Sequence, residues 1–130
     1  MNLSMEQTST MRIRSKLFLT LWLVSMGVVA WGSLQPGVEL PSQLWNADKV
    51  YHLFAYAWLA LLPFAVFQDR RAALGAALAM FVLGLALELL QSLIPGRFAS
   101  GPDMLANALG VGLGIGLARS FGNPRDRESS

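Results

Sequence analysis

Residues 72–94 read AALGAALAMFVLGLALELLQSLI, a run of 23 positions in which Glu88 is the only charged residue. A helix rises about 1.5 Å per residue, so it needs roughly 20 apolar residues to cross the hydrocarbon core of a bilayer. Alanine and leucine, which dominate the run, are strong helix formers. The run is too long for a strand, and it predicts a membrane-spanning helix.

Three further apolar runs accompany it, at residues 17–34, 50–67 and 104–121. Turn-forming residues separate the four runs. They are Gln35-Pro36-Gly37, Leu40-Pro41-Ser42, Gln68-Asp69-Arg70-Arg71, Pro95-Gly96-Arg97 and Ser100-Gly101-Pro102. We therefore expect an all-α fold, an integral membrane four-helix bundle.

The composition excludes most other classes of protein. The chain has 130 residues, of which 54% are hydrophobic and only 14% are charged, and its mean hydropathy is +0.46. An average soluble domain has about 25% charged residues. A chain this short cannot bury so much apolar surface in a soluble core, and a disordered chain needs low hydrophobicity. The absence of cysteine excludes disulfides, thiol catalysis and zinc–thiolate sites.

The ten basic residues are distributed unevenly along the chain. Eight lie in residues 12–16, 68–71 and 119–127. The connection between the first and second runs and the connection between the third and fourth runs hold only Lys49 and Arg97. Basic residues concentrate on the cytoplasmic side of membrane proteins, so both termini are predicted to be cytoplasmic. We expect a disordered leader at 1–15, a four-helix domain at 16–121 and a cytoplasmic tail at 122–130. This distribution explains the net charge of +2 without a nucleic-acid-binding patch.

Polar residues recur along three of the runs at spacings of three and four, which place them on one face of a helix. These residues are Asp48, His52 and Tyr56 in the second run, Gly84, Glu88 and Gln91 in the third, and Asp103, Asn107, Gly110 and Gly114 in the fourth. In an antiparallel bundle the three faces meet at similar depth near the outer side. We expect an outward-facing polar pocket there, to which Lys49, Arg97 and Ser100 also contribute.

Glu88 lies about six residues, or roughly 9 Å, before the outer end of its run. A carboxylate at the centre of a membrane helix costs about 2.5–3.5 kcal/mol on insertion scales, so it must face the bundle interior or a water-filled cavity. Three interpretations remain open. Glu88 pairs with Arg97 or Lys49 to fix the helices, it is a ligand-binding or catalytic carboxylate, or it belongs to an ion relay.

His52 is the only histidine of the chain, and Asp48 lies one helical turn away, where it can orient the ring. Carboxylates together with an imidazole suit a divalent cation. A guanidinium at Arg97 would repel such an ion, so we expect neither a metal nor another cofactor.

Gly110 and Gly114 form a small-xxx-small pair, which lets helices approach closely in lipid. No strand precedes the glycines and no Lys-Ser/Thr follows them, so a phosphate-binding loop is excluded. The partner helix belongs either to the same chain or to another copy, which leaves the oligomeric state open.

The ordered set of polar residues resembles the VanZ-like family. The resemblance covers residues 48–114 and rests on Asp48-Lys49-x-x-His52-x-x-x-Tyr56, followed by Glu88-x-x-Gln91-x-x-x-Pro95-Gly96-Arg97-x-x-Ser100-x-x-Asp103-x-x-x-Asn107-x-x-Gly110-x-x-x-Gly114. It implies a small, multi-pass protein of the bacterial cytoplasmic membrane. The family's namesake is associated with resistance to the glycopeptide antibiotic teicoplanin, and the resemblance supplies no reaction.

Three functions therefore remain open. The first is binding or modification of an envelope lipid, an anionic lipid or glycolipid, or a lipid-like antibiotic by the polar pocket. The second is intramembrane acid–base catalysis on a lipid-linked substrate, for which Glu88, Asp103 and His52 are the candidate catalytic residues. The third is a structural role in which the polar residues only hold the helices together.

Overall fold

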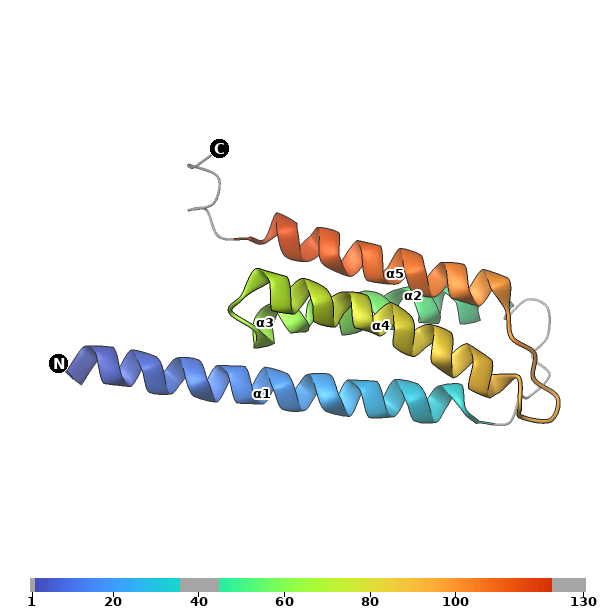
Figure 1. The fold of residues 1–130 in the computed structure, drawn as a ribbon, viewed down its shortest axis with the longest axis horizontal. Coiled ribbons are helices and arrows are strands. Elements are labelled where there is room, and N and C mark those ends of the chain that lie inside the picture. Colours follow the sequence, from blue (N-terminus) through green and yellow to red (C-terminus); the bar gives the residue numbers. More distant parts are fainter. Residues whose placement is uncertain (1, 36–44, 123–130) are drawn as a thin grey trace.

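The computed structural model describes residues 2–35 and 45–122 and consists of helices (Figure 1). They are α1 (Asn2–Ser33), α2 (Trp45–Leu61), α3 (Pro63–Val66), α4 (Arg70–Gln91) and α5 (Gly101–Ser120). The predicted all-α fold is confirmed. The expected turns at Pro36-Gly37 and Leu40-Pro41-Ser42, and the tail from residue 123 onward, lie outside the described residues.

Three helical stretches are long and apolar enough to cross a membrane: Ile13–Ser33, Ala47–Val66 and Arg70–Gln91. The fourth predicted span corresponds to α5, which has 20 residues. Its four glycines within residues 110–116, together with Asp103 and Asn107, lower its mean hydropathy below that of the other three. That α5 crosses the membrane therefore stays a prediction.

Two boundaries differ from those expected from the sequence. Residues 2–15, expected to be a disordered leader, form the first turns of α1. No proline or glycine interrupts them, so the helix of the apolar run continues toward the N-terminus. The second apolar run is divided at Leu62, because Pro63 lacks the N–H that a continuous helix would use.

Side chains of the preceding residues fix where α4 and α5 begin. The carboxylate of Asp69 accepts hydrogen bonds from the backbone N–H groups of Arg71 and Ala72, each at 3.3 Å. The hydroxyl of Ser100 accepts one from the backbone N–H of Asp103, also at 3.3 Å. Both caps satisfy donors that the first turn of a helix leaves without an intrahelical partner.

Helices α2 and α5 make the most extensive contact in the bundle. Gly110 and Gly114 lie directly against α2, where a Cβ atom would collide with the carbonyl oxygens of Leu53 and Ala57 respectively. The absence of side chains at these two positions therefore sets the distance between the helices. Because the contact is so close, it also determines which polar residues of α2 and α5 meet.

Helix α1 lies along the edge of the bundle (Figure 1). Most of its apolar side chains that the structure describes are exposed. Trp22 is an exception, since its indole Nε1 donates to the carbonyl oxygen of Leu59 at 3.0 Å. The hydroxyl of Ser15 donates to the carbonyl oxygen of Val66 at 2.7 Å. The start of α1 and the end of α5 lie at one end of the bundle, and the end of α1 and the connection from α4 to α5 lie at the other.

Candidate functional site

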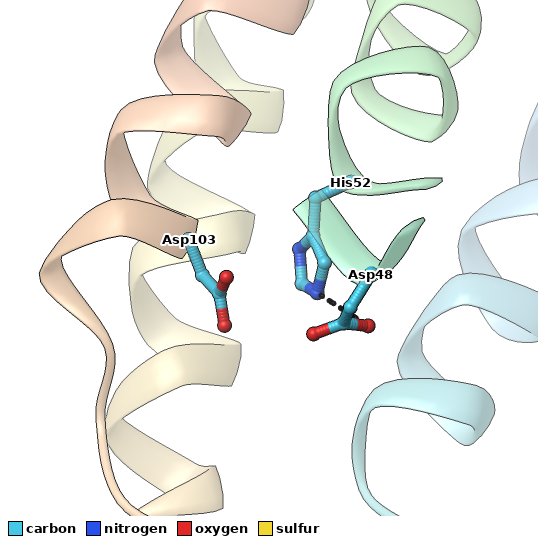
Figure 2. A group of neighbouring side chains, drawn as sticks. All are labelled: Asp48, His52 and Asp103. Atoms are coloured by element: carbon cyan, nitrogen blue, oxygen red, sulfur yellow. Dashed lines mark ion pairs between the residues drawn. The ribbon is translucent and has the colours of Figure 1, made fainter. Parts of the chain in front are cut away.

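Three titratable side chains face one another at the end of the bundle where α1 ends and α4 is connected to α5. Figure 2 shows Asp48 and His52 of α2 opposite Asp103 of α5. One potential ligand atom from each residue lies within 4.8 Å of the other two. The Nε2 atom of His52 is 3.9 Å from a carboxylate oxygen of Asp48. We call these three residues the Asp–His–Asp cluster.

The imidazole of His52 is held from two sides. Its Nδ1 atom lies 2.9 Å from the side-chain oxygen of Asn107, which is only 1% exposed. Because an amide oxygen only accepts hydrogen bonds, Nδ1 carries the proton that is donated to Asn107. The ring also stacks on Tyr56, with 6.3 Å between ring centroids and an interplanar angle of 5°. The opposite ring nitrogen, Nε2, is left facing Asp48.

Glu88 lies behind the cluster and is 1% exposed. Its Oε2 atom accepts a hydrogen bond from the backbone N–H of Ser100 at 3.2 Å, immediately before α5. One turn earlier on α4, Gly84 leaves room for its neighbours on α2 and α5. A Cβ atom there would lie 2.8 Å from Cε1 of Tyr56 and 3.0 Å from Nδ2 of Asn107.

Gln91 and Arg97 connect the site to the end of α1. The amide of Gln91 donates to the carbonyl oxygen of Ser33 at 2.8 Å, and Arg97 donates to the same oxygen at 3.1 Å. Arg97 also donates to the carbonyl oxygen of Gln35 at 2.5 Å. Carbonyls at the C-terminal end of a helix lack intrahelical partners, so they attract donors. Glu88 and Arg97 thus have different partners, which argues against their pairing as the structural role of Glu88.

A cavity of about 190 Å³ opens beside the cluster, between α1, α2 and α4. Of the predicted site residues, Asp48, His52, Tyr56, Gln91 and Arg97 line it. Lys49, Glu88, Ser100, Asp103 and Asn107 do not line it. Lys49 is partly buried near the start of α2, and the other four lie at or behind the contact of α4 and α5 with α2.

An apolar groove of about 450 Å³ runs between α1 and α2 next to the cavity. Val28, Val29, Tyr51 and Ala55 line both spaces. The remainder of the groove is formed by Val24, Ser25, Phe54 and Trp58. The polar cavity and the apolar groove therefore lie side by side, with these four residues in common.

Sequence reasoning missed the contribution of α1 to the site. Gly32, Ser33 and two valines of α1 line the cavity, and the backbone oxygen of Ser33 accepts from Gln91 and Arg97. A backbone carbonyl has no residue-specific signature, so no motif marks it. The end of the first apolar run was the only available signal, since carbonyls are left unpaired there.

The family model described as VanZ/LLP1 matches residues 2–122. No curated protein and no solved structure matches the chain. The match covers nearly the whole chain and includes α1, which lies outside the polar motifs at residues 48–114. The chain therefore belongs to the VanZ/LLP1 family, and its apolar helices are those of a membrane protein.

Proposed function

We propose that this VanZ/LLP1-family membrane protein binds an amphiphilic lipid or glycolipid of the cell envelope. One observation supports the proposal above the others: the polar cavity and the apolar groove between α1 and α2 are adjacent and share four lining residues. A headgroup in the cavity and an acyl or prenyl chain in the groove would satisfy both surfaces. A purely polar ligand would leave the apolar groove uncovered, and a purely apolar ligand would leave the polar cavity uncovered.

The chemistry of the cavity favours a headgroup rich in hydroxyl groups or one that carries an anion. Asp48 and the ring of His52 supply hydrogen-bonding groups, and Tyr51 and Tyr56 supply aromatic faces against which a sugar ring packs. Arg97 lines the same space and brings a permanent positive charge. These groups suit a glycolipid or a phosphate-bearing lipid, and equally a lipid-like glycopeptide antibiotic.

The proposal includes an orientation. The basic residues cluster at 12–16, 68–71 and 119–127, and the positive-inside rule assigns these segments to the cytoplasm. The cavity lies at the opposite end of the bundle. It would then open near the outer leaflet of the bacterial cytoplasmic membrane, where envelope precursors and antibiotics are met.

Native mass spectrometry of the protein released from lipid nanodiscs tests the proposal. Ala55 lines both spaces, so Ala55→Trp adds bulk where the cavity and the groove adjoin. Ala79→Trp adds the same bulk at an exposed position of α4 and is the matched control. We expect a specific lipid to remain bound to the wild type and to Ala79→Trp, and to fall at least tenfold in Ala55→Trp. An unchanged lipid complement in folded Ala55→Trp would contradict the proposal.

Catalysis is the second candidate, and the Asp–His–Asp cluster beside the cavity favours it. An imidazole next to a carboxylate provides a general acid–base pair for a lipid-linked substrate. Incubation of the purified protein with an envelope lipid extract distinguishes the two functions. Binding alone leaves the lipid masses unchanged, whereas catalysis produces a lipid of altered mass that disappears in His52→Gln.

A further inference from the structure

We infer that the Asp–His–Asp cluster is a binding site for a divalent cation that accepts one imidazole nitrogen and two carboxylates, with Zn²⁺ as the best probe. The three residues come from two helices, and their ligand atoms lie within 4.8 Å of one another. Ligands about 2.1 Å from a tetrahedral zinc lie about 3.4 Å apart. Small side-chain rotations are therefore enough to bring the three atoms to coordinating distance.

The hydrogen bond from His52 to Asn107 prepares the ring for a metal. Metal-binding histidines typically donate their second ring nitrogen to an oxygen, which fixes the tautomer and the orientation of the ring. Here Nδ1 donates to the buried side-chain oxygen of Asn107 at 2.9 Å. In the neutral ring, the lone pair of Nε2 then points toward Asp48, and stacking on Tyr56 keeps the ring from turning.

The charges around the cluster also favour a cation. The carboxylates of Asp48 and Asp103 repel each other, and both face the lone pair of the neutral His52 ring. A divalent ion between the three groups removes this repulsion. The sequence argued against a metal because Arg97 would repel it. In the structure, Arg97 instead donates to the carbonyl oxygens of Ser33 and Gln35. Its guanidinium is thus held toward the end of α1.

Three protein ligands leave at least one coordination position open, as in catalytic zinc sites. The side chain of Asp48 is 41% exposed and that of His52 is 14% exposed, so water or a ligand reaches the site. Both residues also line the cavity. The ion would therefore lie where it could contact a phosphate or hydroxyl group in the cavity. The cation site does not depend on the proposed lipid binding, and it is tested without lipid ligand.

Because His52 is the only histidine of the chain, ¹⁵N-histidine NMR reports on one residue. The full-length protein, carrying a purification tag without histidine, is titrated with Zn²⁺ in detergent micelles. We expect saturation at one Zn²⁺ per chain, a large shift of the Nε2 resonance and a smaller one of Nδ1. A spectrum that does not respond to Zn²⁺ would overturn the inference.

Calorimetric Zn²⁺ titration of variants identifies the carboxylate ligands. We expect Asp48→Asn and Asp103→Asn each to weaken binding at least tenfold, and Asn107→Ser to weaken it through the altered support of His52. Asp69→Asn is the matched control, because Asp69 is an exposed helix-capping aspartate outside the cluster and asparagine caps equally well. Far-UV circular dichroism in zinc-free buffer verifies that each variant is folded. If folded Asp48→Asn and Asp103→Asn bind Zn²⁺ with wild-type affinity, the two carboxylates only stabilise the N-terminal turns of their helices. That result would refute the cation site.

Discussion

Replacing Gly114 with alanine tests the closest approach in the bundle. The new Cβ atom would collide with the carbonyl oxygen of Ala57 and would lie 3.0 Å from the Cβ atom of Ala60. Neither group is the end of a flexible side chain, so α2 and α5 must move apart to make room. Overpacking of this kind typically costs about 1–3 kcal/mol.

The matched control is Gly116→Ala on the same helix, where a Cβ atom would have nothing within 4 Å. Both variants share the gain in helix propensity from glycine to alanine, about 0.8–1 kcal/mol. The difference in their free energies of unfolding therefore isolates the overpacking cost, and we expect Gly114→Ala to be less stable by about 1–3 kcal/mol. Unfolding by SDS titration in mixed micelles, followed by far-UV circular dichroism, measures it. Equal transition midpoints would show that this face of α5 does not pack against α2.

Three other outcomes are expected. A single cysteine in place of Phe98 should react with an impermeant thiol reagent in intact cells, whereas one in place of Gln68 should react only after permeabilisation. The reverse result would invert the proposed orientation. Trp22→Phe removes the hydrogen bond to Leu59 and should destabilise the attachment of α1 by about 0.5–1.5 kcal/mol, seen as faster proteolysis within α1. Glu88→Gln keeps an acceptor for the N–H of Ser100 while removing a buried charge, so its SDS midpoint should equal or exceed that of the wild type; a lower midpoint would indicate an essential ionic partner.

The sequence predicted the helices well where length and apolar composition determine them. The run at 72–94 corresponds to α4 at Arg70–Gln91, and the run at 104–121 corresponds to α5 at Gly101–Ser120. The boundaries shifted because caps determine helix starts, and Asp69 and Ser100 are the capping residues. The division of the second run was missed, although Pro63 was visible, because hydropathy alone does not register a lost backbone donor.

The site was only partly predictable, because periodicity and antiparallel packing predict that the polar faces meet but not which side chains contact one another. Glu88 has the most unusual position in the sequence, and pairing with Arg97 or Lys49 was one of three interpretations that the sequence left open. In the structure it accepts from a backbone N–H instead. The residues that face one another are Asp48, His52 and Asp103, because α2 and α5 make the closest contact. The glycines indicated that α5 packs closely somewhere, but not that α2 is its partner.

The polar residues of the site form two groups. Those of the first group donate or accept hydrogen bonds that join different parts of the bundle, and those of the second group face the space of the cluster. Glu88, Gln91, Arg97 and Asn107 hold α4, the following connection and α5 to their neighbours. The carboxylates of Asp48 and Asp103, together with Nε2 of His52, face the shared space of the cluster. Membrane helices gain no hydrophobic free energy by associating within lipid, so the first group contributes to assembly. Under the proposed function, the second group is the one that would bind the ligand. Substitutions of Gln91, Arg97 or Asn107 that remove these hydrogen bonds should lower stability together with binding. Neutral substitutions in the second group should remove binding from a bundle that remains folded.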